Sequence, residues 1–336
     1  MHNSFGNNFR ITLYGGSHES VIGVVIEGIP SGLALSGTDF MTDLDRRRPS
    51  AKGTTARREA DIPHISGGVR DGFTDGSPLV IEFHNGDMRP GDYSQFESVP
   101  RPGHVDYVTH PQRYGVHGVR EFQDFTGGGM FSGRMTVALV AAGVVAKKIL
   151  AAVLPQVKIN ASLKAVGGCD DSIRWESLVE QVMAEGDSIG GVVEAVVSGL
   201  PVGLGEPFFD SVESVVSHLV FSIPGVRGVE FGDGFAAAAM RGSEHNDPFG
   251  PDGSPVKNGA GGVNGGLSNG ADLVFRVAFK PASTISKVQH TYDFSRGEMT
   301  ELSARGRHDA CFALRTPVIV EAVTAIALVD LLGSVE

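Results

Sequence analysis

Residues 130–153, MFSGRMTVALVAAGVVAKKILAAV, constrain the fold more than any other segment, because they predict a helix that is apolar on nearly every face. A surface helix keeps a polar face, so this helix must be covered by other elements. Its longest uncharged apolar run, residues 136–146, is too short to cross a bilayer. We therefore expect a core helix of a globular protein, with no membrane partner.

Further periodic segments predict the elements that cover this helix. Residues 9–30 read as a strand, a glycine turn and a second strand, and residues 77–84 read as another strand. Apolar spacing and end signals predict three more helices. The first, residues 37–49, has Thr38 or Asp39 as N-cap and ends at Pro49. The second, residues 208–222, has Asp210 or Ser211 as N-cap, and the third, residues 315–332, has Pro317 in its first turn. The polar residues 85–126 predict a long functional loop.

An internal sequence similarity indicates a duplicated architecture. EGIPSGL at residues 27–33 is similar to SGLPVGL at residues 198–204, and each follows an apolar strand pattern and precedes a helix. Short strings of this kind also match by chance. This internal similarity favours an α+β fold in which residues 1–336 form a single domain of two similar halves, roughly 1–155 and 156–336.

Charge and cysteine content exclude several classes of protein. The formal net charge of −11 argues against a nucleic-acid partner, which requires a large basic footprint. The N-terminal residues MHNSFGNNFR show no signal peptide. Cys169 and Cys311 form neither a disulfide framework nor a metal framework. We expect a cytoplasmic protein.

The basic stretch RRRPSAKGTTARR, residues 46–58, is unusual in so acidic a chain. It is either a solvated loop neutralised by nearby carboxylates or a clamp for an anion, since arginine binds carboxylate and phosphate in two-pronged fashion. Its cations are Arg46, Arg47, Arg48, Lys52, Arg57 and Arg58, and the polar loop adds Arg101, Arg113 and Arg120.

Two histidines lie in glycine-flanked turns, His18 in YGGSHES and His104 in RPGHVDY. Imidazole exchanges protons near neutral pH, so the pair suggests acid–base chemistry, although a lone histidine is more often structural. A metal site at His104, Asp106 and His110 is a weak alternative, because the spacing matches no strong zinc pattern. We expect no metal.

Two glycine- or arginine-rich segments precede helices. TGGGMFSGRMT, residues 126–136, runs into the core helix, and such a helix N-terminus can receive phosphate. It is neither a Walker loop nor a dinucleotide motif, so it indicates no particular cofactor. SARGRHDACFALRTP, residues 303–317, brings Arg307, His308 and Asp309 together; Asp309 is either a proton acceptor or a turn residue in an ion pair.

Taken in their order along the chain, these sequence motifs resemble those of the chorismate synthase family, and the resemblance covers nearly the whole chain. The resemblance rests on motifs from FGNNFRITLYGGSHE to RHDACFALRTPVIVEAV, including LDRRRP, TTARRE, RPGHVDY, YGVHGVREF, EGDSIGG, LPVGLGEPFFD, GVRGVEFGDGF, RGSEHND, GGLSNG and FKPAST. It implies a β-α-β sandwich with internal pseudo-symmetry, and an enzyme that eliminates phosphate from 5-enolpyruvylshikimate 3-phosphate to give chorismate. It further implies reduced FMN (FMNH2) as cofactor with no net redox change, an association with NADP, and a homotetramer.

The resemblance also implies roles for particular residues. His18 would give a proton to the departing phosphate, His104 would protonate the reduced flavin, and Asp309 would act in removing the substrate proton. Substrate would be bound by Ser17, Arg47, Arg101 and Arg134, and FMN by Ser132, His245, Asn246, Lys280, Ser283, Thr284 and Arg307.

The chain departs from the family pattern in three places. Gly16 and Glu19 replace a glutamate and a glycine around His18. Met130 and Phe131 stand where an arginine and a serine would contact flavin and substrate, and Met135 replaces a glutamate. Gly53 stands where a further arginine is usual, and the adjacent Lys52 is a candidate to compensate. The alternatives to the family activity are a diverged relative that uses another anionic substrate, a non-catalytic ligand-binding paralogue, and a metal-dependent hydrolase.

Overall fold

The computed structural model describes residues 3–109, 126, 128–304 and 308–333. Two antiparallel sheets form its frame. The first has the order β1 (Ser4–Phe5), β2 (Arg10–Gly15), β3 (Val21–Glu27), β7 (Leu79–His84), β4 (His64–Gly67). The second has the order β10 (Val226–Phe231), β13 (Leu273–Phe279), β9 (Gly191–Ser198), β8 (Lys158–Val166). Three two-stranded ribbons complete the strands: β5 (Val69–Arg70) with β6 (Phe73–Thr74), β11 (Val263–Asn264) with β12 (Leu267–Ser268), and β14 (Gln289–Asp293) with β15 (Glu298–Leu302).

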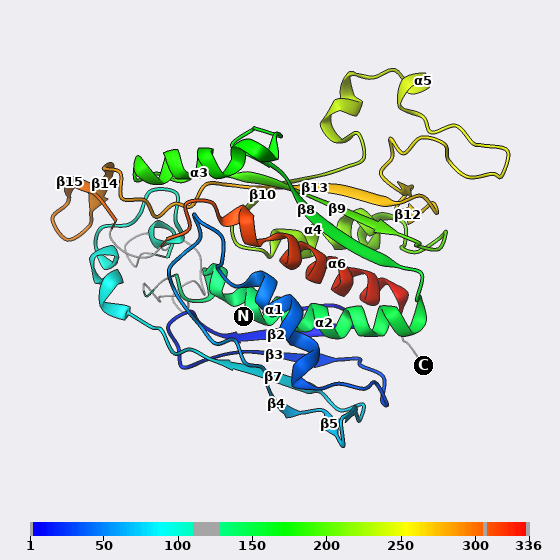
Figure 1. The fold of residues 1–336 in the computed structure, drawn as a ribbon, viewed down its shortest axis with the longest axis horizontal. Helices are drawn as coiled ribbons and strands as arrows, with labels where there is room; N and C mark the ends of the chain where they lie inside the picture. The colour runs from blue at the N-terminus through cyan, green and yellow to red at the C-terminus, as the bar shows by residue number, and fades with distance from the viewer. Residues whose placement is uncertain (1–2, 110–125, 127, 305–307, 334–336) are drawn as a thin grey trace.

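Helices fill the space between the two sheets, as Figure 1 shows. The predicted core helix is α2 (Thr136–Val153), which packs on β3 and β7 and against α6 (Pro317–Leu332), and α6 packs in turn on β8 and β9. A Cβ atom at Gly143 would lie 2.3 Å from the Cβ of Ala322, so a glycine is needed for the two helices to approach. Covered on both sides, α2 and α6 can be apolar all round.

The four remaining helices are α1 (Met41–Arg47), α3 (Trp175–Ala184), α4 (Val212–Phe221) and α5 (Gly242–His245). Helix α1 packs on α2, α4 packs on α6, and α3 lies on the outside. The α+β class and the sandwich of sheets around helices are therefore as predicted. Strands β9 and β13 of the second sheet alternate buried and half-buried side chains, as a sheet with one face on the core requires.

The two sheets share one order of connection. Strands β2-β3-β7-β4 in the first correspond to β8-β9-β13-β10 in the second, and a helix (α1 or α4) follows the second strand of each set. A buried helix (α2 or α6) follows the last strand of each half. This correspondence supports the predicted repeat, while the boundary near residue 155 stays a prediction.

The helix ends largely follow the predicted signals. The hydroxyl of Ser211 accepts a hydrogen bond from Ser214 N at 3.1 Å and caps α4, and Pro317 is the first residue of α6. The cap predicted at Thr38 or Asp39 is wrong: Ser36 is the N-cap, and the Asp39 carboxylate accepts from Ser36 N at 2.7 Å. A short 3-10 turn, Gly37–Phe40, separates this cap from α1.

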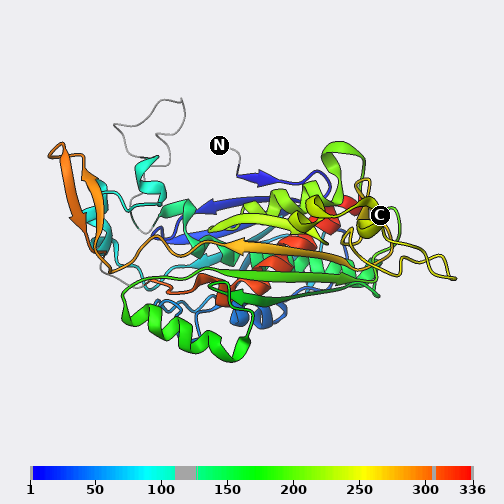
Figure 2. The same cartoon turned by 90° about the horizontal axis from the view of Figure 1, so that it is seen from above.

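Residues 133–153 meet the length and hydropathy criteria for a membrane-crossing helix, with 72% of the stretch buried inside the protein. The apolar helical stretch is therefore longer than the run of residues 136–146 from which a membrane-crossing helix was excluded. Its burial against β3, β7 and α6 is nevertheless that of a core helix. At the periphery, Figures 1 and 2 place the β14–β15 hairpin and α5 at opposite ends of the longest axis.

Candidate functional site

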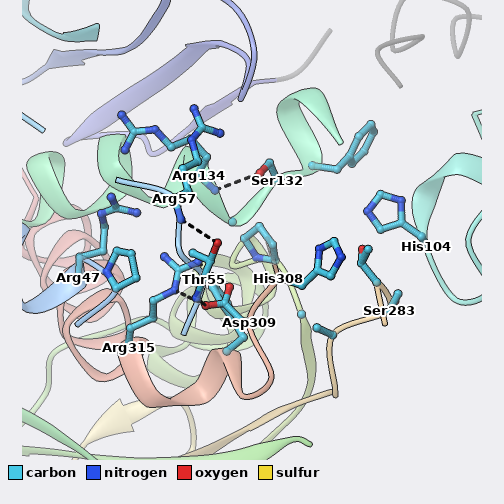
Figure 3. A pocket seen from close by; sticks show the side chains of 18 of the residues that line it. Arg47, Thr55, Arg57, His104, Ser132, Arg134, Ser283, His308, Asp309 and Arg315 are labelled. Atoms are coloured by element: carbon cyan, nitrogen blue, oxygen red, sulfur yellow. Dashed lines mark hydrogen bonds and ion pairs between the residues drawn. The ribbon is translucent and has the colours of Figure 1, made fainter. Parts of the chain in front are cut away.

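A cavity of about 270 Å³ lies near the β14–β15 end of the molecule. It is lined by the start of the segment that follows α1, by the turns that precede α2 and α6, and by the segment after β13. Figure 3 shows arginine, histidine and aspartate side chains converging on it. Its charged and acid–base lining residues are His18, Arg47, Arg48, Arg57, Glu59, Asp61, Arg101, His104, Arg134, Lys280, His308, Asp309 and Arg315.

The innermost wall holds two buried guanidinium groups that share a single carboxylate. Arg47 Nη2 lies 2.5 Å from Asp61 Oδ2, and Arg134 Nη1 binds Asp61 Oδ1. Burial raises the pKa of Asp61, but the two arginines outweigh it and hold the pKa below its usual value. Burial lowers the pKa of Arg47 to about 10, against the effect of Asp61, so Arg47 is charged at neutral pH.

Within the described residues, Arg47 Nε and Arg134 Nη2 are buried without a hydrogen-bond partner. A buried donor left unpaired is unfavourable, and a guanidinium most readily pairs with an anion. Arg47 and Arg134 also carry one more positive charge than Asp61 neutralises. This wall is therefore suited to a carboxylate or phosphate.

A second charged group surrounds Asp106. Arg101 donates to both of its oxygens, at 2.6 and 2.7 Å, and its guanidinium stacks 4.3 Å from the centre of the Phe96 ring. His104 Nδ1 lies 2.6 Å from Asp106 Oδ1, so the imidazole donates from Nδ1. Burial lowers the pKa of His104, although Asp106 opposes the change, and the ring is held near its neutral form.

Asp309 lies at the entrance to α6 in an ion pair. Its Oδ2 lies 2.9 Å from Arg315 Nη2, and its Oδ1 accepts from Thr55 N, also at 2.9 Å. The predicted alternative in which Asp309 forms an ion pair is therefore confirmed. The same carboxylate also lines the cavity (Figure 3).

His18 is oriented by the residue before it. Ser17 donates its hydroxyl proton to the Thr126 carbonyl at 3.1 Å, so Ser17 Oγ accepts from His18 Nδ1 at 3.0 Å. This arrangement fixes the tautomer and turns Nε2 into the nitrogen that exchanges protons. The His18 ring also stands edge-on to Tyr93, with ring centres 4.8 Å apart.

The segment after β13 supplies a cation and two hydroxyls. Lys280 Nζ donates to the Gly103 carbonyl at 2.7 Å and contacts Ser283 Oγ, while Thr284 Oγ1 accepts from Arg101 at 3.0 Å. In the described residues, Lys280 has no carboxylate in an ion pair. Burial lowers its pKa, as does the neighbouring charge of Arg227. A lysine beside hydroxyl donors is a suitable site for a phosphate.

The structure gathers ten of the predicted site residues around the cavity: His18, Arg47, Arg101, His104, Ser132, Arg134, Lys280, Ser283, Thr284 and Asp309. Ser17 lies behind His18 and is completely buried. His245 and Asn246 lie in and just after α5, which is at the opposite end of the molecule from the β14–β15 hairpin (Figure 1), and they do not line the cavity. Arg307 lies outside the described residues.

Part of the basic stretch, residues 46–58, faces the cavity as an anion clamp would, and part of it lies away from the cavity as a solvated loop would. Arg47, Arg48 and Arg57 line the cavity, whereas Arg46, Lys52 and Arg58 do not. The expectation that Lys52 compensates for Gly53 is wrong, because Lys52 is exposed and pairs with Glu180 on α3. Of the loop cations, Arg113 and Arg120 lie outside the described residues, as does His110 of the metal alternative. Among the described residues no group of three His, Cys, Asp or Glu side chains is placed to bind a metal ion.

The two replacements in the flavin loop are not equivalent. Phe131 lines the cavity and is 43% exposed, so its ring is available to a ligand. Met130 does not line it, and its sulfur lies 3.9 Å from Asn3 Nδ2. The structure therefore places Phe131, and not Met130, at the cavity.

Sequence reasoning missed several lining residues. Asp61 is one of the nearby carboxylates that would neutralise the basic stretch as a solvated loop, and no role in the site was predicted for it or for Thr55, Tyr93, Phe312 and Arg315. A signal existed for Arg315, six residues after Asp309 and at the entrance to a predicted helix. Asp61 has no comparable signal, because its position between Arg47 and Arg134 depends on the tertiary fold.

Fold and cavity together define a class of protein: an α+β enzyme that binds a small polyanion beside several acid–base groups. The comparisons with known proteins refine this class. A family model described as chorismate synthase matches residues 9–332. The chorismate synthase of Chitinophaga pinensis is 52% identical over 98% of this chain and 96% of its own length. That of Methylacidiphilum infernorum is 43% identical over 98% and 96%, respectively.

A tomato protein named chorismate synthase 2, chloroplastic, is 41% identical over 98% of this chain and 81% of its own. A solved crystal structure of a chorismate synthase superposes with a TM-score of 0.69, at 24% identity, over 98% of this chain and 92% of the other. The structural match supports the fold. The chain belongs to the chorismate synthase family of carbon–oxygen lyases in the shikimate pathway.

Proposed function

We propose that the chain eliminates phosphate from 5-enolpyruvylshikimate 3-phosphate in the trans-1,4 sense and gives chorismate, with reduced FMN as cofactor. The observation that carries the proposal is the pair of buried, incompletely paired guanidinium groups of Arg47 and Arg134, beside His18, His104 and Asp309. The substrate has two carboxylates and a phosphate. A cavity with more cations than carboxylates suits such a ligand.

The acid–base groups are separated and have different partners. His18, whose Nδ1 is held by Ser17, can hold a proton at Nε2 for the departing phosphate. Asp309, which is paired with Arg315, can accept a proton. His104 is fixed by Asp106 and can transfer a proton through its other nitrogen. Groups in such different surroundings can serve as acid and base at one pH.

The residues around the cavity fit a flavin nucleotide. Lys280 and Ser283 suit the phosphate of FMN, and the exposed Phe131 ring suits a planar ring system. When bound, reduced FMN supplies an electron-rich ring that can lend an electron transiently and recover it. His245 and Asn246 remain predicted flavin residues, although this chain alone does not bring them to the cavity.

The activity is tested anaerobically with purified protein, chemically reduced FMN and 5-enolpyruvylshikimate 3-phosphate, with chorismate absorbance and phosphate release followed together. We expect equal amounts of both products, and only with reduced flavin. Binding of the shikimate ester without release of phosphate contradicts the proposal and favours the diverged relative. Replacing the chemical reductant with NADPH tests whether the association with NADP extends to this chain.

We also propose a homotetramer in the cytoplasm. Phe208 and Phe209 are 85% and 90% exposed on one short turn, which is unusual for a monomer surface. Both cysteines, Cys169 and Cys311, are free thiols, as a reducing compartment favours. Light scattering during size-exclusion chromatography tests the assembly, and a mass near 35.3 kDa contradicts it.

A further inference from the structure

His308 lines the cavity and has no role in the proposed mechanism. It precedes Asp309 in the segment that leads into α6, and Figure 3 shows its ring between Asp309 and the side chains of His104 and Ser283. Its Nε2 atom is buried and has no hydrogen-bond partner among the described residues. A buried nitrogen in this position is expected to have a partner once a ligand is bound.

The protonation of the ring follows from its surroundings. The imidazole donates to the Ala304 carbonyl, and because Nε2 has no partner, the donor is Nδ1. Burial lowers the pKa of His308, as does the charge of Arg101, while Asp309 and Asp92 act in the opposite direction. The ring is therefore neutral at pH 7, and Nε2 presents a lone pair to the cavity.

The neighbouring acceptors already have partners. Asp309 is bound by Arg315 and Thr55 N, Asp106 by Arg101 and His104, and Asp61 by Arg47 and Arg134. The remaining charged groups of the wall are mainly cationic and attract the negative parts of a ligand. His308 Nε2 is thus placed to bind a different part of it, an uncharged donor.

We propose that His308 Nε2 accepts a hydrogen bond from a neutral O–H or N–H group of the bound ligand. This inference rests on the proposed function, in which two molecules carry such groups. At neutral pH 5-enolpyruvylshikimate 3-phosphate has one hydroxyl donor, on its ring. Reduced FMN has ring N–H groups and ribityl hydroxyls. In either case His308 adds recognition of a neutral group to a site that otherwise binds anions.

The test compares His308→Leu, which removes the acceptor, with His308→Gln, whose amide oxygen can occupy the place of Nε2. His64→Leu, an exposed histidine on β4, is the matched control. Dissociation constants for the shikimate ester and for reduced FMN are measured separately by anaerobic calorimetry. Thermal unfolding confirms that every variant is folded.

We expect His308→Leu to weaken one of the two ligands about tenfold, and His308→Gln to restore binding to within about threefold. Weakened binding of the ester identifies its hydroxyl as the donor, and weakened binding of FMN identifies the flavin. Unchanged binding of both ligands in His308→Leu overturns the inference. Equal losses in the Leu and Gln variants also overturn it, because they show a packing role. Turnover by the wild-type protein is measured independently, so failure of the proposed function is recognised separately.

Discussion

Arg46 and Glu321 form a two-pronged ion pair in which Nη1 and Nη2 of the arginine each lie 2.7 Å from a carboxylate oxygen. Glu321 is 4% exposed within the largely apolar helix α6, and it also binds Lys147 at 3.0 Å. Because Arg46 directly precedes Arg47, this pair anchors the end of α1 that presents Arg47 to the cavity. Glu321 is therefore a positioning residue for Arg47.

Replacing Glu321 with Gln should raise the KM for the shikimate ester about tenfold with a smaller change in kcat, since the binding of an anion is disturbed and not its protonation. Steady-state kinetics measure this split. Asp330→Asn is the control, because Asp330 is a buried carboxylate of the same helix that caps the backbone of Asn7 and Phe9. A rise in KM of equal size in both variants would indicate general destabilisation.

His18→Ala should lower kcat by about 10²- to 10⁴-fold, the usual contribution of a positioned acid, and leave FMN binding unchanged. Turnover and flavin titration are measured on the same preparation. Ser17→Ala is informative beside it: losing the 3.0 Å contact to His18 Nδ1 should reduce kcat less. Wild-type turnover in His18→Ala would remove this residue from the mechanism.

Phe131→Ser should weaken FMN binding on the order of tenfold, because it removes an aromatic surface available to the flavin ring. Met130→Arg serves as the matched variant one residue away. Since Met130 faces Asn3 and not the cavity, its replacement should change FMN affinity by less than about threefold. Flavin titration measures both. A larger effect at Met130 than at Phe131 would contradict the assigned orientations.

Gly53→Ala should destabilise the protein more than Gly32→Ala. Both glycines have positive φ, +89° and +85°, so each substitution imposes a backbone strain of about 1–2 kcal/mol. At Gly53 the new Cβ would also lie 2.2 Å from Val179 Cγ1, whereas no atom lies within 4 Å at Gly32. Urea unfolding measures the difference, and equal losses would show that α3 moves freely aside. The same crowding explains why an arginine is not accommodated at this position.

Thermal stability should fall as the pH is lowered from 7.5 to 5.5. Burial lowers the pKa of His104 and of His308, so the unfolded chain binds more protons than the folded chain once the pH falls below about 6.5. His308→Gln should make this fall shallower. Asp61 and Asp106, whose pKa values are lowered by their arginines, lose their stabilising contribution only at more acidic pH. An identical pH profile for variant and wild type would contradict the prediction.

The sequence predicted the parts of the fold that depend on local pattern. The apolar residues on nearly every face of residues 130–153 predicted a buried helix, and the apolar spacing of residues 315–332, with Pro317 in the first turn, predicted a further helix. Side-chain partners could not be predicted in the same way, because they depend on packing between distant segments. Arg46 and Arg47 are adjacent in the chain, yet Arg46 binds the buried Glu321 of α6 and Arg47 binds Asp61 at the cavity.

The cavity draws its lining from segments as far apart as His18 and Arg315. Its two walls come from the two corresponding sheet-and-helix units, which meet through the contact of α2 with α6. The first unit supplies the wall of Arg47 and Arg134 with His18 and His104, and the second supplies Lys280, Ser283 and Asp309, so the complete site exists only after the whole chain has folded. Ligand binding is therefore coupled to the folding of the whole chain. A saturating ligand should raise the free energy of unfolding of both units together, and a substitution that destabilises either unit should weaken ligand binding.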